Sequence, residues 1–557
     1  MKTIKNRYTI IIAGVPLTFL ALFYFYPLIK IFTLSLIPDH ALDLREFGKL
    51  ISTPYYIRTL WFTTWQAAVS TVLTLIIALP GAYIFARYRF PGKNILQSFT
   101  AIPFVLPSVV VAAAFHALLG PRGILNTWLM NDFAFAAPPI QLDHTIWFIL
   151  MAHVFYNYTV VLRIVGSAWS RLQPGLTEAA HMLGASPWKA FWKITFPLLF
   201  PSISAASLLV FIFCFSSFGV ILILGGPRYA TIEVEIYRQA VHIFNLPMAA
   251  ALSLIQIFFT FAFMWVYTTL QRKTSVALYP ESRRATQKTP VRLRERIIVW
   301  GNVLVMVLML GGPLASLVIQ SFRAPDGFSL VFYRAIFENR AQSIFYIPPV
   351  EAIAYSVGFA LAALVMSLII GGCAATFIVR GGKRITSLFD PIFMLPLATS
   401  AVTLGFGYII ALDRPPLNLR TSIILIPLAH TLVAYPFVVR SILPALRSIP
   451  ENLRESAAML GASSLQVWMK VVMPIVRRSM IVGAVFAFTV SIGEFGATVF
   501  VARPQTPTMP LAIYRFLGQP GVMNYGQAMA MSTLLMLVTA VGFLFLEKIR
   551  ITSEGEF

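Results

Sequence analysis

The sequence predicts an all-α polytopic membrane protein with about twelve transmembrane helices in two six-helix halves. Three observations lead to this fold class: the chain is 58% hydrophobic, only 11% of its 557 residues are charged, and the apolar residues gather in long runs. Soluble proteins carry roughly 25% charged residues, so a string of small water-soluble domains is excluded. The net charge of +22 does not indicate nucleic-acid binding, because the basic residues are spread between the apolar runs.

Twelve apolar runs are long enough to cross a membrane as helices. The first follows Lys2, Lys5 and Arg7, but it is long and lacks a small-residue cleavage site, so we interpret it as a retained helix and not a signal peptide. The cores of the twelve runs are 9–34, 57–85, 97–119, 145–166, 202–224, 248–270, 297–321, 352–379, 388–411, 421–441, 479–501 and 526–546.

The basic residues predict the orientation of these helices. When the N-terminus is placed in the cytoplasm, every inside segment is basic, and together these segments hold 29 of the 43 Lys and Arg residues. We therefore expect both termini in the cytoplasm. The net charge is then mainly an orientation signal, and contact with the anionic lipid bilayer accounts for the rest.

The two halves of the chain repeat each other at a fixed offset of 277 residues. The repeat pairs His153 with His430, MLGAS at 182–186 with MLGAS at 459–463, and Ile-Tyr-Arg at 236–238 with the same triplet at 513–515. Upstream the offset is 289, so the external loop after the third helix is 12 residues longer in the first half. Two parallel halves of this kind are expected to face each other across a pseudo-twofold axis along the membrane normal.

The repeat and a basic, Pro-containing stretch predict the domain organisation. We expect an N-terminal helix and external loop, a first core, a cytoplasmic linker, a seventh helix with an external loop, a second core and a short cytoplasmic tail. Their predicted ranges are 1–56, 57–271, 272–296, 297–350, 351–547 and 548–557.

Two segments on the predicted cytoplasmic side share one pattern. Segment 176–199 has the sequence LTEAAHMLGASPWKAFWKITFPLL, and segment 453–476 has LRESAAMLGASSLQVWMKVVMPIV. Each is expected to form two short helices joined at a glycine, Gly184 or Gly461, and ended before the next span by Pro197 or Pro474. A plain loop between spans needs no such pattern. The repetition therefore predicts that each segment docks on something in the cytoplasm.

The pattern Glu-Ala-Ala, three residues, Gly, nine residues, Ile-x-Leu-Pro resembles the cytoplasmic loop of binding-protein-dependent ABC-importer permeases. The first segment matches with Phe196 in place of the usual leucine, and the second matches more loosely. The matching residues are Glu178, Ala179, Ala180, Gly184, Ile194 and Pro197, and Glu455, Ser456, Ala457, Gly461, Val471 and Pro474. The resemblance covers about 57–270 and 353–546. It is strongest to the fused ferric-iron and thiamine permeases, on the segments FCFSSFGVILILGGPRYATIEVEIYRQA from Phe213 and SIGEFGATVF from Ser491.

This resemblance implies two type I ABC-importer permease halves in the plasma (inner) membrane of a prokaryote. It implies that each cytoplasmic loop seats a coupling helix in a groove on one of two ATPase subunits, while a solute-binding protein delivers the solute outside. The chain has no Gly-x4-Gly-Lys-Ser/Thr phosphate loop and no catalytic or metal-ligand cluster, so we expect a transport subunit that is not an enzyme, binds no cofactor and leaves ATP to its partners. Ferric iron, thiamine and another small polar solute stay open.

Glu494 is predicted to lie about 15 residues into the eleventh helix, near the middle of the bilayer. An acid at that depth either lines the path and contacts a cationic solute, or makes a structural hydrogen bond at a kink beside Gly493 and Gly496. Its counterpart in the first half is the neutral Ser217, the second candidate pathway residue. The matched pair His153 and His430 is expected to join helices rather than bind solute.

The external segments 225–245 and 503–524 are long and matched, and they are expected to form the mouth of the path and part of the docking surface for the binding protein, or simply to pack over the helices. A different class of function, an ion-gradient-driven secondary transporter, also fits twelve spans and a duplicated half. That alternative requires coupling acids inside the membrane, where Glu494 is the one deep acid of the predicted spans, and it leaves the two patterned loops unexplained.

Overall fold

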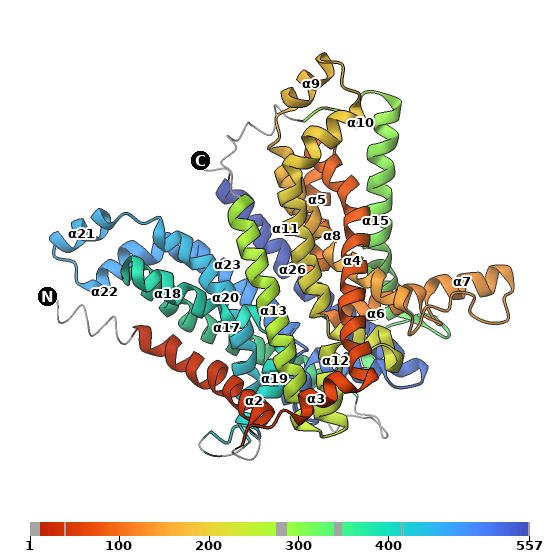
Figure 1. The fold of residues 1–557 in the computed structure, drawn as a ribbon. Coiled ribbons are helices and arrows are strands. Elements are labelled where there is room, and N and C mark those ends of the chain that lie inside the picture. The colour runs from red at the N-terminus through yellow and green to blue at the C-terminus, as the bar shows by residue number, and fades with distance from the viewer. Residues whose placement is uncertain are drawn as a thin grey trace. The chain divides into compact units, whose positions relative to one another are not determined.

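The computed structural model describes residues 12–37, 41–274, 287–338, 348–413, 415 and 417–554 (Figure 1). The chain divides into two compact units. The core-1 unit comprises Lys49–Glu235 and Ile255–Ser329, and the core-2 unit comprises Met1–Gly48, Ile236–Leu254 and Leu330–Phe557. The two predicted cores thus fall mainly into different units, and each unit also contains the helix that precedes the other core in sequence.

The core-1 unit is built from long apolar helices joined by short turns. A two-stranded antiparallel hairpin follows its last long helix, with Arg323 opposite Phe328 and Ala324 opposite Gly327. Its elements, three of which (α3, α12 and α13) have residues in both units, are α3 (Arg45–Ser52), α4 (Pro54–Arg87), α5 (Lys93–Val105), α6 (Ser108–Leu119), α7 (Ile124–Phe133), α8 (Ile146–Ser170), α9 (Pro174–Met182), α10 (Pro187–Ala190), η2 (Phe191–Thr195), α11 (Phe196–Phe215), η3 (Ile221–Gly225), η4 (Gly226–Arg228), α12 (Ile232–Tyr237), α13 (Leu246–Thr274), α15 (Leu293–Phe322), β1 (Arg323–Ala324) and β2 (Gly327–Phe328).

The core-2 unit repeats this plan with the N-terminal helix added. A helix from Ile12 to Leu36, which includes the π turn η1, packs against α19 and α20, and the Tyr24 hydroxyl hydrogen-bonds Thr399 Oγ1 at 2.7 Å. Its elements are η1 (Ala21–Phe25), α2 (Tyr26–Leu36), η5 (Arg238–His242), α16 (Val331–Ala335), α17 (Pro349–Arg380), α18 (Gly382–Met394), η6 (Leu395–Ala398), α19 (Ala401–Ala411), α20 (Leu425–Arg447), α21 (Glu451–Met459), α22 (Ser464–Val467), η7 (Trp468–Val472), α23 (Met473–Ile492), α24 (Thr498–Val501), α25 (Met509–Leu517) and α26 (Val522–Glu554).

Small residues at helix crossings hold each unit together. In the core-1 unit, α4 packs along α8, where Gly166 lies against Ala82. In the core-2 unit, α17 packs along α20, and a Cβ added to Gly371 would lie 2.9 Å from the Val438 side chain. Such close backbone approach is the usual way in which membrane helices gain packing energy, because lipid provides no hydrophobic drive for their association.

The prediction of about twelve spans is confirmed within the described residues. Eleven helices are long and apolar enough to cross a membrane, and Leu388–Ala398 with Ala401–Ala411 forms a twelfth, bent by 93°. The predicted third span, 97–119, is likewise interrupted, because α5 ends at Val105 and α6 begins after Pro107. Proline fixes its own backbone and lacks an amide donor, which explains this break.

Two predicted spans are too long at their C-terminal ends. The fifth was placed at 202–224 and the eleventh at 479–501, but α11 ends at Phe215 and α23 ends at Ile492. Ser216 and Ser217 interrupt the first helix, and Gly493 and Gly496 lie in the second break. Hydropathy continues through both breaks, which is why the apolar run alone does not reveal them.

The described end of the predicted linker is fastened to the core-1 unit. Residues 275–286 of this linker lie outside the described residues. The Lys288 amide donates to the Arg87 carbonyl at 2.9 Å, and its carbonyl accepts from the Arg89 amide at 3.0 Å. The Lys288 ammonium donates to Glu295 Oε1 at 2.6 Å and lies 5.2 Å from the centre of the Tyr88 ring. The hydrogen bond to Glu295 raises the pKa of Lys288.

Candidate functional site

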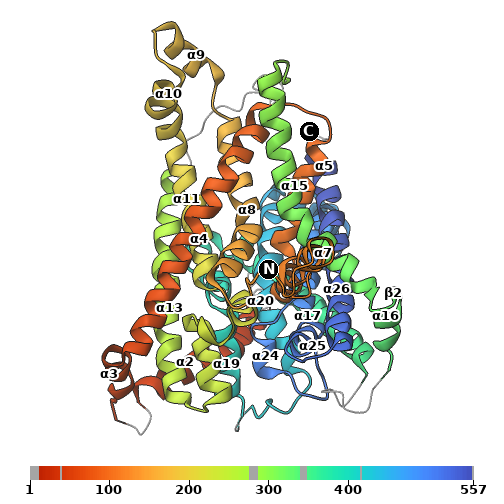
Figure 2. The same cartoon turned by 90° about the vertical axis from the view of Figure 1, so that its right-hand side faces the viewer.

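The two patterned segments fold into the same sequence of elements. Each begins with a short helix, α9 or α21, and continues through a glycine to a four-residue helix, α10 or α22, then to a π turn and a long membrane helix. In each unit this segment projects past the end of the long helix that follows it (Figure 1). A view at 90° shows the α9–α10 projection beyond the end of α11 in the core-1 unit (Figure 2). We call these segments, 174–195 and 451–472, the first and second cytoplasmic loops, after the side of the membrane on which the sequence predicts them.

A glycine in the left-handed region makes the corner of each loop. Gly184 has a φ of +80° and Gly461 a φ of +85°. In the first loop the Ala185 amide donates to the Ala180 carbonyl at 2.9 Å, which is the bond that closes a Schellman helix end. The second loop has the equivalent bond from Ala462 to Ala457, at 3.1 Å. The predicted helix break at both glycines is therefore confirmed.

The serine after each corner starts the next helix. The Ser186 hydroxyl accepts from the Lys189 amide at 3.3 Å. In the second loop, Ser463 accepts from the Gln466 amide at 3.3 Å while the Gln466 side chain accepts from the Ser463 amide at 2.8 Å, which forms a capping box. The MLGAS repeat thus encodes a helix end, a corner and a helix start, which gives both loops one rigid shape.

The prediction that Pro197 and Pro474 end the second helix of each loop is wrong. The helical chain runs without a stop from Pro187 to Phe215, and from Ser464 to Ile492. A five-residue π turn precedes each proline-containing first turn, and the Phe196 amide donates to the Phe191 carbonyl five residues back. The wider turn shifts the hydrogen-bond register, so the proline enters at a position where its missing amide costs little.

The other predicted loop residues lie mostly on exposed or half-buried surface. Glu178, Ala179, Glu455, Ser456, Pro197 and Pro474 are exposed, and Ala457, Ile194 and Val471 are half-buried. Ala180 is buried. The residues of the repeated pattern therefore lie in the matching loop of each unit, and their role in coupling stays a prediction.

Sequence reasoning missed the most exposed apolar side chains of the loops. Met182 and Leu183 are 90% and 89% exposed, and Met459 and Leu460 are both 89% exposed. They come directly before the corner glycine of each loop, and we call each pair the tip of its loop. Large apolar side chains fully in solvent on a projecting loop mark a contact surface for another molecule. The signal was present in the sequence, because both copies of MLGAS begin with this pair.

In the core-1 unit, the helix break after α11 is held by His153. Its ring nitrogens hydrogen-bond the Ser70 hydroxyl through Nδ1 at 2.9 Å and the Ser217 hydroxyl through Nε2 at 2.9 Å. The imidazole is buried. Ser217, a predicted pathway residue, is therefore engaged with a structural partner from α8.

In the core-2 unit, His430 occupies the matching place. Its Nδ1 lies 2.8 Å from the Ser491 hydroxyl and its Nε2 lies 2.8 Å from Thr498 Oγ1. The matched histidines thus join helices in both units, as predicted.

Glu494 lies in the break after α23 and not inside a continuous helix, so its predicted position on the eleventh helix is wrong. Its carboxylate accepts hydrogen bonds from the Ala497 amide at 2.8 Å, from the Thr498 amide at 3.0 Å and from the Thr498 hydroxyl. It also lies 3.5 Å from His430 Nε2. These contacts are those of a group that caps the start of α24. Contact between Glu494 and a solute stays a prediction.

Two further buried acids were not predicted. Glu233 and Glu235 lie on α12, in the first predicted external segment, and both are buried. Gln256 donates to Glu233 Oε1 at 3.0 Å, and the Tyr55 hydroxyl donates to Glu235 Oε2 at 2.7 Å. The sequence left two interpretations of this segment open, the external mouth of the path or packing over the helices, and it gave no sign that these two acids are buried. In the matched segment, α25 of the core-2 unit also has a largely buried face.

The chain is similar in sequence to known transport permeases. Residues 78–276 match the family described as binding-protein-dependent transport system inner membrane component. The thiamine transport system permease protein ThiP of Brucella abortus (strain 2308) is 26% identical over 470 residues, which cover 83% of each chain. ThiP of Escherichia coli (strain K12) is 26% identical over 468 residues, 82% of this chain and 83% of that protein.

The likeness also extends to a second class of permease. The ferric transport system permease protein FbpB of Actinobacillus pleuropneumoniae is 25% identical over 556 residues, which cover 96% of this chain and 78% of that protein. Among solved structures, a chain of a bacterial ABC transporter involved in the import of the acidic polysaccharide alginate aligns with 49% of this chain and 97% of its own length, with 18% identity and a TM-score of 0.40.

Proposed function

We propose that this chain, a fused binding-protein-dependent ABC permease, forms the membrane path of an importer for ferric iron or thiamine. The observation that carries the proposal is the pair of cytoplasmic loops, which have the same order of elements in both units and each expose a Met-Leu pair before the corner glycine. The similarity to thiamine and ferric permeases over most of the chain supports the choice of solute.

Each loop docks on one separate ATPase subunit, and the Met-Leu tip enters a groove on that subunit. The long helices support this role, because α10 and α22 continue through a π turn into α11 and α23 without a break. A push on the loop is therefore transmitted along a continuous helix of 29 residues in each unit. ATP binding closes the ATPase pair and rocks the two halves, so that the path opens outward, and hydrolysis resets it. ATP is hydrolysed by the partners and not by this chain.

A solute-binding protein delivers the solute from the opposite side. The excess of basic residues in the segments beside the loops supports a cytoplasmic location for both loops and both termini. The external segments that contain α12 and α25 then lie at the mouth of the path. The binding protein supplies much of the selectivity, so the permease itself needs no deep solute site.

The coupling role is tested by the double variant Gly184→Pro with Gly461→Pro. Proline is held at a φ near −65° and cannot adopt the left-handed conformation of either corner. We expect ATPase association and uptake both to fail while membrane insertion persists. The matched control is Gly184→Asn with Gly461→Asn, because asparagine tolerates the left-handed region, and this variant keeps uptake. Normal uptake in the proline variant contradicts the coupling role.

The solute is tested with vesicles that contain the permease, its ATPase subunits and its binding protein. Uptake of labelled thiamine and of labelled ferric iron is measured with ATP inside, and again with an imposed ion gradient but no ATP. We expect ATP-dependent uptake of one of the two solutes. Uptake driven by the gradient alone supports the secondary transporter instead.

A further inference from the structure

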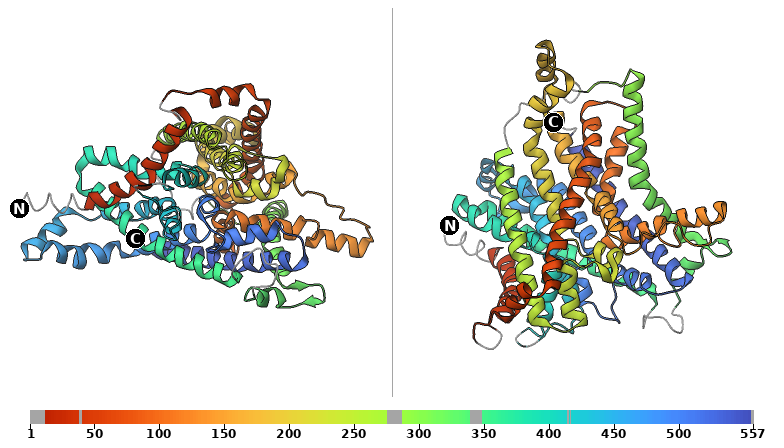
Figure 3. Two further views of the ribbon diagram at one scale, coloured as in Figure 1. Left: turned by 90° about the horizontal axis from the view of Figure 1, so that it is seen from below. Right: turned by 45° about the vertical axis from the view of Figure 1, so that its right-hand side comes forward.

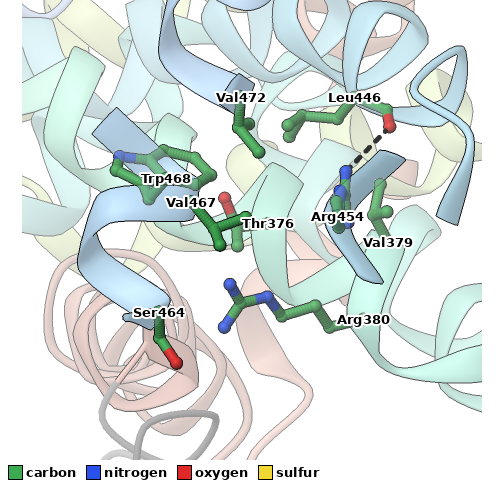
Figure 4. Close-up of a pocket in the computed structure, with 9 residues that line it drawn as sticks. All are labelled: Thr376, Val379, Arg380, Leu446, Arg454, Ser464, Val467, Trp468 and Val472. Atoms are coloured by element: carbon green, nitrogen blue, oxygen red, sulfur yellow. Dashed lines mark hydrogen bonds between the residues drawn. The ribbon is translucent and has the colours of Figure 1, made fainter. Parts of the chain in front are cut away.

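A small cavity at the base of the second cytoplasmic loop contains two arginines. It lies entirely within the core-2 unit, between the ends of α17 and α20 and the residues of α21, α22 and η7 (Figure 4). Arg380 comes from α17 and Arg454 from α21, and both residues line the cavity (Figure 4). Thr376, Ser464 and Trp468 add polar groups, and aliphatic side chains form the rest of the lining.

No carboxylate lines this cavity among the residues that the structure describes. One Arg454 terminal nitrogen donates a long hydrogen bond of 3.4 Å to the Leu446 carbonyl, while its Nε is buried without a partner. The nearby acid Asp390 instead pairs with Arg447 at 3.4 Å. Two guanidinium groups in one cavity repel each other, so the arrangement favours an anion that accepts from both.

The equivalent place in the core-1 unit is balanced. Arg87 ends α4 as Arg380 ends α17, and it donates to the Leu172 carbonyl at 3.2 Å. The charge of Glu178 acts on Arg87. The residue that matches Arg454 at the offset of 277 is the neutral Thr177. At the base of the first loop, Arg87 therefore feels the charge of an acid, whereas the cavity at the base of the second loop is lined by two arginines and no acid among its described lining residues.

We infer that Arg380 and Arg454 bind the phosphate group of an anionic lipid of the membrane leaflet next to the loops. Arg380 is the last residue of a 32-residue apolar helix, which places its guanidinium where lipid phosphates lie. Arginine forks bind phosphate oxygens in pairs, and basic pockets between transmembrane helices are known lipid headgroup sites. The bound phosphate bridges α17 and α21, so it holds the second loop to the membrane helices.

The site is tested by lipid retention on the purified full-length protein. The protein is exchanged into nanodiscs of phosphatidylcholine with a trace of labelled phosphatidylglycerol, and bound label is measured. We expect Arg380→Gln with Arg454→Gln to lower retention at least tenfold. The charge-matched control, Arg87→Gln with Arg171→Gln in the core-1 unit, keeps it. Arg380→Lys with Arg454→Lys gives an intermediate value, because lysine keeps the charge and loses the fork.

Three outcomes decide the proposal. The proposal is overturned if the Arg380→Gln, Arg454→Gln variant retains as much labelled lipid as the core-1 control variant. This comparison requires that both variants elute as single species with an unchanged melting temperature. If the wild type retains no lipid label but binds labelled inorganic phosphate at millimolar concentration, and the Gln pair does not, the lipid proposal is overturned and the cavity is a site for free phosphate. If the two arginines become protected from a guanidinium-modifying reagent only when ATPase subunits are added, a partner's carboxylate occupies the cavity and the lipid site is refuted.

Discussion

Removal of the apolar loop tips will weaken ATPase binding without destabilising the permease. The perturbation is Met182→Ser with Leu183→Ser in the first loop, or Met459→Ser with Leu460→Ser in the second. Complete burial of such a side chain is worth about 1.5–3 kcal/mol, and all four are about 90% exposed before docking. If docking buries about two thirds of each side chain, the Met-Leu pair of one loop contributes about 2–4 kcal/mol to the free energy of binding the ATPase subunit. This corresponds to a loss of about 30- to 700-fold in affinity.

The assay is the dissociation constant between the purified permease and its ATPase subunit, measured in detergent by a surface-binding method. The melting temperature of each variant must stay within error of the wild type, because exposed side chains contribute little to folding. A matched control is Leu42→Ser with Ile51→Ser, which removes two apolar residues that are 72% and 76% exposed in the predicted external loop. Affinity unchanged in both tip variants refutes the docking of the tips.

Three further predictions concern single interactions. Glu494→Ala will lower the free energy of unfolding by about 2–4 kcal/mol, because two hydrogen bonds from backbone amides to the carboxylate are lost, and Glu494→Gln will lower it less. If the Gln variant loses uptake while its melting temperature is unchanged, Glu494 contacts the solute instead. Gly371→Val will lower the free energy of unfolding by about 1–3 kcal/mol, measured by a thermal melt, because the new Cβ meets the Val438 side chain. Gly372→Ala will not lower it, because no atom of another helix lies within 4 Å of the new Cβ. Lys288→Met will cost at most about 0.5 kcal/mol, since the pair with Glu295 is solvent-exposed. The pKa of Lys288 is raised in the folded state, so the stabilisation by the Lys288–Glu295 pair is fully present below the ordinary lysine pKa of 10.5 and is lost as the pH rises through the pKa of the folded state. A difference in unfolding free energy between wild type and variant that grows at alkaline pH contradicts this prediction.

The repeat made the membrane helices and the cytoplasmic loops predictable. Apolar runs report the free energy of burial in lipid, so the spans other than the third, fifth, ninth and eleventh were predictable from the length of the run alone. The corners at Gly184 and Gly461 were predictable because they depend on a local property, the freedom of glycine to adopt a positive φ at the end of a helix.

The helix breaks and the π turns were not predictable from these signals. Hydropathy stays high through the breaks after Phe215 and Ile492, and the interruption depends on tertiary hydrogen bonds from His153 and His430. Pro197 predicts a helix end by the usual rule, but a π turn admits it, and such a turn has no simple sequence pattern.

The arrangement of elements in space was also beyond the sequence. The N-terminal helix belongs to the core-2 unit and α15 to the core-1 unit, because each helix finds its packing partners there. Helix α7 lies across the direction of α15 in the core-1 unit (Figure 3), although its apolar residues continue those of α6 in sequence. Apolar periodicity describes a helix by itself and not the neighbour that it packs against.

The most direct measurement compares uptake by liposomes that contain this chain alone with uptake by liposomes that contain it together with two ATPase subunits, with binding protein and labelled solute outside in both. With ATP inside, only the assembled complex will accumulate solute, and the proline variants at Gly184 and Gly461 will abolish that accumulation. Accumulation by the chain alone would contradict the account, because it would show that the two loops need no external source of force.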